Sequence, residues 1–241
     1  MRNPVLGLFS APSARSGTSR KALHTSPSGY TSNMAPEGAI ENADGALIRS
    51  VDSALASAYA RAGAWMACRP GCDPCCLGPF EITQLDALRL RRGITELHRR
   101  DPRRARRVLT RARAAWRQMR DSFPGDRDTG VLSDDEEAQE RFFTIFEPVP
   151  CPALDPRTRT CDLYIWRPIT CRAFGPPVQC GPERFRICDL CFRGAPDEEI
   201  RRCSVDLDPE GVEVELLDRL ARETGAAGLT IIPWVLAQVR L

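Results

Sequence analysis

The sequence predicts a mostly α-helical protein whose helices pack around a small, irregular, cysteine-rich metal centre with one or two short hairpins. Apolar residues recur at three- and four-residue spacing over much of the chain, and there is no alternation of strands with helices. Eleven cysteines accompany only two histidines in 241 residues, more than an apolar core of this size needs. They gather where Pro and Gly break the helical pattern, which indicates loops held by metal ions.

The N-terminal segment, residues 1–36, contains no Asp or Glu and shows neither helical nor strand spacing. We expect a disordered tail or a start codon placed too early, because Met34 lies just ahead of the first helical pattern. An organellar transit peptide is the alternative, since the segment is free of acids and contains Ser and Arg. A single metal-binding domain is expected over 37–241.

The first helix is expected over 42–67, where an amphipathic stripe leads directly into Cys68. Thr83, with Asp86 three residues later, resembles a capping box and opens the next helix. Gly93 is expected to end that helix, because glycine is common just after helix C-termini.

A long helix is expected from Asp101-Pro102, an N-cap followed by proline at the first position, to about Asp121. Its buried stripe consists of Val108, Leu109, Ala112, Trp116 and Met119. Ser133 and Glu136 form a second capping-box pattern. The helix that follows is expected to bury Phe142, Phe143, Ile145 and Phe146.

The composition changes over 148–193, where frequent prolines and cysteines indicate a hairpin, a short helix and loops. Asp208-Pro209 begins a final amphipathic helix, which Gly225 ends. A short strand is expected over 229–232, and Pro233 then begins one or two helical turns.

Net charge and missing motifs exclude several classes of protein. The formal net charge is only +2, which excludes a uniformly basic nucleic-acid binder. No run approaches the ~18 apolar residues of a membrane span. The motifs of P-loop nucleotide hydrolases, zinc proteases, serine hydrolases and dinucleotide-binding folds do not occur. Because no secretory signal is recognisable, we expect a cytoplasmic protein with reduced thiols.

The strongest pattern is Cys68-Arg-Pro-Gly-Cys72-Asp-Pro-Cys75-Cys76, or C-x3-C-x2-C-C. Two thiolates at C-x2-C spacing can meet one ion across a tight turn, and Gly and Pro favour such turns. Adjacent side chains such as Cys75 and Cys76 usually diverge, so one mononuclear ion does not take both. A cluster or a second site is therefore implied.

A second group of cysteines lies in the irregular segment and just beyond it. It consists of Cys151, Cys161, Cys171, Cys180, Cys188, Cys191 and Cys203. Cys188 and Cys191 repeat the C-x2-C spacing, and only the fold can bring them to the first cluster. Sulfur ligands almost without histidine favour zinc or an iron–sulfur cluster, and the residue types do not decide between the two.

These motifs resemble a known family. The Cys68–Cys76 cluster is followed by Cys151-Pro-Ala-Leu154, Cys161-Asp-Leu-Tyr164 and Arg167-Pro-Ile-Thr-Cys171-Arg172. The combination is similar to the CxxCxxCC zinc- or iron-chelating family, the YkgJ-type cysteine-cluster proteins, over roughly 68–191. The family shares eight cysteines, of which the chain matches seven clearly. The eighth is Cys180, Cys188 or Cys191, and spacing favours Cys188-x2-Cys191.

The expected metal ligands are therefore nine cysteines: Cys68, Cys72, Cys75, Cys76, Cys151, Cys161, Cys171, Cys188 and Cys191. Cys203, outside the match, is expected to be a plain buried thiol. Three arginines beside the ligands are expected to offset thiolate charge, namely Arg69, Arg167 and Arg172.

Three alternatives stand beside a metal-binding protein. One branch of the family comprises flagellin lysine N-methylases, which are longer, so a cluster-dependent protein lysine N-methyltransferase is the first. A radical S-adenosylmethionine enzyme shares C-x3-C-x2-C but would need alternating strands and helices. The third is a nucleic-acid-binding module built on 89–120, which holds thirteen arginines against Glu96 and Asp101.

We consider nucleic-acid binding the weaker interpretation of 89–120. Residues 121–147 hold nine acids against two arginines, so a solvated helix facing an acidic neighbour is expected. A protein partner and the oligomeric state are left open by the sequence.

Overall fold

The computed structural model describes residues 35–180 and 184–241. The predictions for the N-terminal segment up to residue 34 lie outside the described residues. Eight α-helices occur in the described ranges, and they confirm the mostly helical class. They are α1 Ala35–Ala62, α2 Gln84–Arg100, α3 Pro102–Met119, α4 Glu136–Ile145, α5 Ile169–Arg172, α6 Asp197–Cys203, α7 Val212–Thr224 and α8 Ile232–Ala237.

The described strands are two residues long each and pair antiparallel. They are β1 Glu81–Ile82, β2 Leu154–Asp155, β3 Thr160–Cys161, β4 Val178–Gln179, β5 Phe185–Arg186 and β6 Thr230–Ile231. β2 pairs with β3 and β4 with β5, while β1 pairs with β6 from the far end of the chain. The short strand expected near the C-terminus is therefore present as β6.

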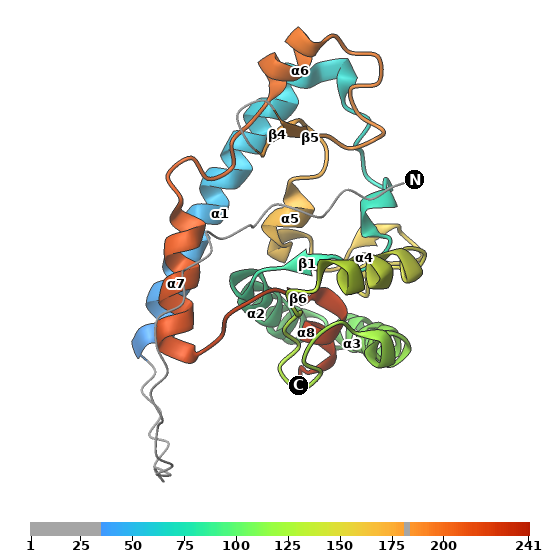
Figure 1. The fold of residues 1–241 in the computed structure, drawn as a ribbon, viewed down its shortest axis with the longest axis vertical. Helices are drawn as coiled ribbons and strands as arrows, with labels where there is room; N and C mark the ends of the chain where they lie inside the picture. Colours follow the sequence, from blue (N-terminus) through green and yellow to red (C-terminus); the bar gives the residue numbers. More distant parts are fainter. Residues whose placement is uncertain (1–34, 181–183) are drawn as a thin grey trace.

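The helices form two groups (Figure 1). The long α1 lies beside α7, with α6 near its C-terminal end. α2 and α8 pack against α3 in the second group. α5 lies between the two groups in the view, and the cysteine-rich segments connect them. The apolar core is correspondingly divided into a large cluster in the second group, a cluster between α1 and α7, and a small one near Cys191.

α1 differs from its expected bounds, because it ends at Ala62 and does not lead directly into Cys68. Gly63 adopts a positive φ of 49°, which takes the backbone out of the right-handed helical region. A 3-10 turn over Gly63–Trp65 follows. Cys68 therefore lies in a loop.

α2 begins at the predicted capping box, in which the Thr83 side chain accepts from the Asp86 N–H and Asp86 accepts from the Thr83 N–H. The prediction that Gly93 ends this helix is wrong. α2 continues to Arg100, and Gly93 lies under the indole of Trp166. A Cβ at this position would lie 2.4 Å from Trp166 Cγ, so the glycine permits close packing and does not act as a cap.

α3 begins as predicted, with the Asp101 side chain accepting from the Arg104 N–H and Pro102 in the first turn. Its predicted stripe is buried except for the half-buried Trp116. α4 is capped by Asp135 and not by Ser133. Ile145 on α4, expected to be buried, is 62% exposed.

α6 was not predicted, since its seven residues are too short for a periodic pattern. α7 is preceded by Gly211 in the left-handed region. Asp208 still caps the N-terminus of α7, because the Asp208 carboxylate accepts hydrogen bonds from the N–H groups of Val212 and Glu213. Gly225 ends α7 with a φ of 75°, as predicted. Every helix of the described ranges is too short or too polar to cross a bilayer.

Candidate metal centre

Seven of the nine predicted ligands line one cavity of about 510 Å³. They come from the loop after α1, from the region of β2 and β3, and from α5. They are Cys68, Cys72, Cys75, Cys76, Cys151, Cys161 and Cys171. The fold therefore brings both predicted groups of cysteines to the same place.

The first sulfur group, which we define as Cys68, Cys188 and Cys191, contains the two remaining predicted ligands. The side chain of Cys68 hydrogen-bonds those of Cys188 and Cys191. Backbone N–H groups also reach these sulfurs: Leu190 donates to Cys188, and Ala67 donates to Cys191 at 3.4 Å. The hydrogen bond from Cys68 lowers the pKa of Cys188 to about 6. The same hydrogen bond raises the pKa of Cys68.

The second sulfur group, which we define as Cys75, Cys151, Cys161 and Cys171, consists of half-buried cysteines. Burial raises the pKa of Cys151 to about 12 and also raises the pKa values of Cys161 and Cys171. Repulsion between neighbouring thiolates in the group adds to this rise. The pKa of Cys75 is raised first by its hydrogen bond with Cys76 and then by burial.

Backbone N–H groups point at two sulfurs of the second sulfur group. Ala153 and Leu154 donate to Cys151, and Leu163 donates to Cys161. These hydrogen bonds lower the pKa values of both thiols and so favour the thiolate. Donors around a sulfur are also typical of the outer shell of metal-bound thiolates.

Cys75 connects the two groups electrostatically, since its pKa responds to the charge of Cys188 while its own charge raises the pKa values of Cys151 and Cys161. The thiols of the second group therefore keep their protons unless positive charge enters the cavity. A bound cation would supply that charge.

Three arginines lie on the otherwise largely apolar wall of the cavity. Arg69, Arg159 and Arg167 line it, and no Asp or Glu is among its described lining residues. Arg159 forms an ion pair with Asp73, while the Arg167 guanidinium lies over the Tyr164 ring at 3.8 Å from the centroid. Two of the three arginines expected to offset thiolate charge, Arg69 and Arg167, thus lie beside the sulfurs.

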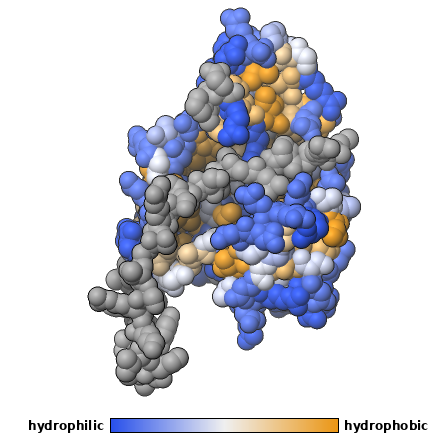
Figure 2. Space-filling view, in the orientation of Figure 1, coloured by the Kyte–Doolittle hydropathy of each residue, from blue (hydrophilic) through white to orange (hydrophobic). Residues whose placement is uncertain are grey.

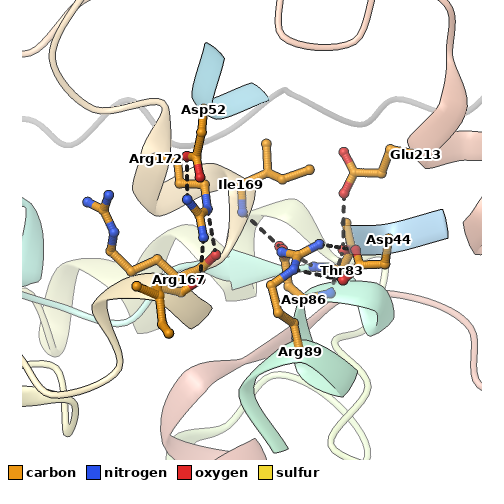
Figure 3. Close-up of polar contacts among 10 residues, drawn as sticks. Asp44, Asp52, Thr83, Asp86, Arg89, Arg167, Ile169, Arg172 and Glu213 are labelled. Carbon is orange, nitrogen blue, oxygen red and sulfur yellow. Dashed lines mark hydrogen bonds and ion pairs between the residues drawn. The ribbon is translucent and has the colours of Figure 1, made fainter. Parts of the chain in front are cut away.

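Arg172, the third of these arginines, has a different role. Its Nε donates to the Arg167 carbonyl at 3.1 Å, its Nη2 donates to the Ile165 carbonyl at 2.6 Å, and it pairs with Asp52 of α1 (Figure 3). The side chain is 3% exposed. It therefore fixes the turn that leads into α5 and Cys171, and does not face the sulfurs.

A second polar contact fixes the beginning of α5. The Asp86 carboxylate accepts from the Ile169 N–H at 3.0 Å and pairs with Arg89 (Figure 3). Arg89 also pairs with Asp44 of α1. These buried ions hold the cysteine-bearing α5 against both α1 and α2, which the sequence pattern of R-P-x-x-C-R did not indicate.

The cysteine sulfurs of the described residues are not arranged around a single metal position. Among the described residues, no three His, Cys, Asp or Glu side chains are grouped closely enough to hold a metal ion. Two other cysteines lie apart from the cavity: Cys180 donates to the Arg184 carbonyl, and Cys203 is fully buried in the small apolar cluster. Cys203 is a buried thiol, as expected.

Sequence reasoning missed three polar residues at the cavity: Thr160, Arg159 and Tyr59. Tyr59 lies in the expected first helix and was not interpreted as a site residue. Its hydroxyl lies 3.5 Å from the Phe174 carbonyl. Burial raises the pKa of Tyr59, and the neighbouring Cys68 raises it further. The phenol is therefore a neutral donor beside the first sulfur group.

Comparison with family models, curated proteins and solved structures finds no match to this chain. The likeness to YkgJ-type cysteine-cluster proteins rests on the motifs alone and stays a prediction. The lysine N-methyltransferase alternative likewise stays a prediction.

Proposed function

We propose that this chain is a cytoplasmic metal-binding protein that holds zinc or an iron–sulfur cluster through thiolates of the two sulfur groups. The observation that carries the proposal is the meeting of the seven cavity cysteines with Cys188 and Cys191. Buried cysteines without metal need no such meeting, because a single thiol packs as an ordinary small apolar side chain.

The chemistry of the site supports the same proposal. Backbone N–H groups already aim at sulfurs of both groups, which favours bound thiolates. Arg69 and Arg167 on the cavity wall would offset negative charge, since a zinc ion with four thiolates carries a formal charge of about −2. A reducing compartment keeps the thiols available, which is the reason for proposing a cytoplasmic location.

More than one metal atom per chain is expected. Cys75 and Cys76 both line the cavity together with the rest of the second sulfur group, and Cys68 of the first sulfur group lines it while contacting Cys188 and Cys191. Four thiolates complete a tetrahedral zinc site, so the remaining cysteines would hold a second ion or belong to a cluster. Bound zinc would supply structural stability, and a cluster would supply electron transfer.

Metal analysis and an ultraviolet–visible spectrum of anaerobically purified protein test the proposal. We expect either stoichiometric zinc in a colourless protein, or iron and acid-labile sulfide with broad visible absorbance. Cys171→Ser is expected to lower the metal content and the midpoint of thermal unfolding, because it removes a sulfur of the second sulfur group.

The matched control is Cys180→Ser, which changes a half-buried cysteine outside the cavity. It is expected to keep the full metal content. Native protein without bound metal, or equal metal content in native protein and Cys171→Ser, would refute the proposal.

A further inference from the structure

α3 carries a basic face that the metal site does not use. The helix contains no Asp or Glu, and five of its arginines are exposed. They are Arg103, Arg106, Arg107, Arg113 and Arg117. At 3.6 residues per turn, these five fall within an arc of about 120° opposite the buried stripe. Figure 2 shows hydrophilic residues over the lower part of the molecule, where α3 lies in Figure 1.

The arginines on the flank of α3 have a different environment. Arg104 and Arg111 pair with the buried Asp162 at 2.5 and 2.6 Å. These two ion pairs tie α3 to the segment between Cys161 and α5. They are therefore part of the fold and lie outside the basic face.

The basic face itself lacks carboxylate partners. Within residues 35–180 and 184–241, its five arginines form no ion pair, and among the five only Arg113 forms a guanidinium hydrogen bond, to the Val239 carbonyl at 2.9 Å. Among the described residues no ion pair joins these five arginines to the acidic segment 121–147. Asp121 of that segment pairs with Arg120, just beyond α3, and Glu137 pairs with Arg141 of its own helix. The five exposed arginines of α3 thus lack a carboxylate partner within ion-pair distance.

The form of the face suits an extended anion. Thr110 and Ala114 lie along its centre, with arginines on both sides, so a partner can approach the backbone closely while both rows reach outward. From Arg103 to Arg117 the face runs about 21 Å along the helix axis. Duplex DNA presents one negative charge per about 1.7 Å, so its phosphates extend along the whole face.

We propose that the basic face of α3 binds duplex DNA through its phosphates, without base specificity. A protein partner would need apolar anchors, and α3 contributes none of the exposed large apolar residues. Single-stranded nucleic acid binds by stacking its bases on exposed aromatic rings. Trp116, the aromatic residue of α3, instead packs edge-on against Phe123, with 5.2 Å between the ring centroids. An α-helix enters the major groove of B-form DNA, whereas that of A-form RNA is too narrow.

Fluorescence anisotropy with a labelled mixed-sequence DNA duplex of about 20 base pairs tests this proposal over a salt series of about 50–200 mM. Native protein is expected to bind with a Kd of about 1–100 μM, as typical of non-specific DNA binding. In Arg103→Gln/Arg106→Gln/Arg107→Gln, the slope of log K against log salt should become shallower by about 3, with at least a ~10-fold loss of affinity at low salt.

The control, Arg49→Gln/Arg201→Gln/Arg222→Gln, changes the net charge equally at exposed arginines of α1, α6 and α7. It should retain the native slope and affinity. An equal loss in this control would assign binding to net charge and overturn the proposal. So would unchanged binding by the α3 variant, equal affinity for duplex RNA, or equal competition by poly-glutamate. Metal content does not enter this test, so its outcome is separate from that of the metal proposal.

Discussion

Glu213 is a buried carboxyl at the beginning of α7, 5% exposed, and it faces the charged residues that hold α5 in place. Thr83 donates to its Oε1 at 3.3 Å (Figure 3). Burial raises its pKa to about 8, and the neighbouring Asp86 contributes to the rise while Arg89 opposes it. The folded protein therefore holds this proton well above the pH at which an unfolded chain releases it.

Stability should consequently fall as pH rises. Between about pH 4.5 and 8 the folded state binds more protons at Glu213 than the unfolded state does, so the free energy of unfolding decreases with pH and levels off above 8. Glu213→Gln keeps a neutral side chain and should remove this decrease. Relative to native protein, we expect a gain on the order of 1–3 kcal/mol at pH 8.5 and little change at pH 4.

Urea unfolding across this pH range measures the effect. Glu215→Gln, an exposed position on the same helix, serves as the control and should follow the native pH profile. If Glu213→Gln also followed the native profile, the buried carboxyl would not be the source of the pH dependence.

At the scale of elements, the packing of Trp166 on α2 depends on Gly93. Gly93→Ala places a methyl group 2.4 Å from Trp166 Cγ, so the indole or the helix must shift. Overpacking of this kind costs about 1–3 kcal/mol, which exceeds the gain of about 1 kcal/mol from replacing a helical glycine. We expect thermal unfolding of Gly93→Ala at a lower temperature than native protein.

Gly45→Ala is the matched substitution in α1. Its new Cβ would meet Arg49 at 3.5 Å, an ordinary contact, and should raise stability by about 0.5–1 kcal/mol. Opposite signs for the two alanines would locate the cost at the Trp166 contact. A stabilised Gly93→Ala would contradict the packing argument.

Gly93 also shows which kinds of helix boundary the sequence can predict and which it cannot. The sequence predicted a helix boundary correctly where the residues that determine it lie within one turn of each other. Examples are the Thr83 capping box, the Asp101 cap and Gly225 in the left-handed region. The local pattern was misleading at Gly93, because the reason for glycine is a side chain that is distant in the sequence.

The sequence likewise predicted some features of the candidate site and not others. Motif spacing singled out the seven cysteines that line the cavity, and also the distant Cys188 and Cys191, which lie beside Cys68. It did not predict that Cys68 would be the one to hydrogen-bond them, since loops of irregular backbone set that pairing. It also did not predict that Asp86 and Arg172 position α5, because Asp86 was interpreted as part of a helix cap and Arg172 as a positive charge beside the thiolates.

At the scale of the molecule, the core is divided, and the cysteines lie where its parts meet. The large apolar cluster includes half-buried Cys151, Cys161 and Cys171, whereas Cys68, Cys188 and Cys191 belong to the small cluster at the end of α1. Under the proposed function, metal bound to both sulfur groups would link two separate apolar clusters. It would stabilise the fold by its own binding free energy, because the unfolded chain does not preform the site.

Removal of metal should therefore loosen one end of the molecule more than the other. Chelation under reducing conditions is expected to lower the unfolding midpoint, and hydrogen exchange should accelerate first around Cys68 and 184–191. Exchange in α2, α3 and α8 should change least, since these helices pack on one another within the large apolar cluster. Uniform acceleration across all helices would mean that the metal supports the whole core and does not join its parts.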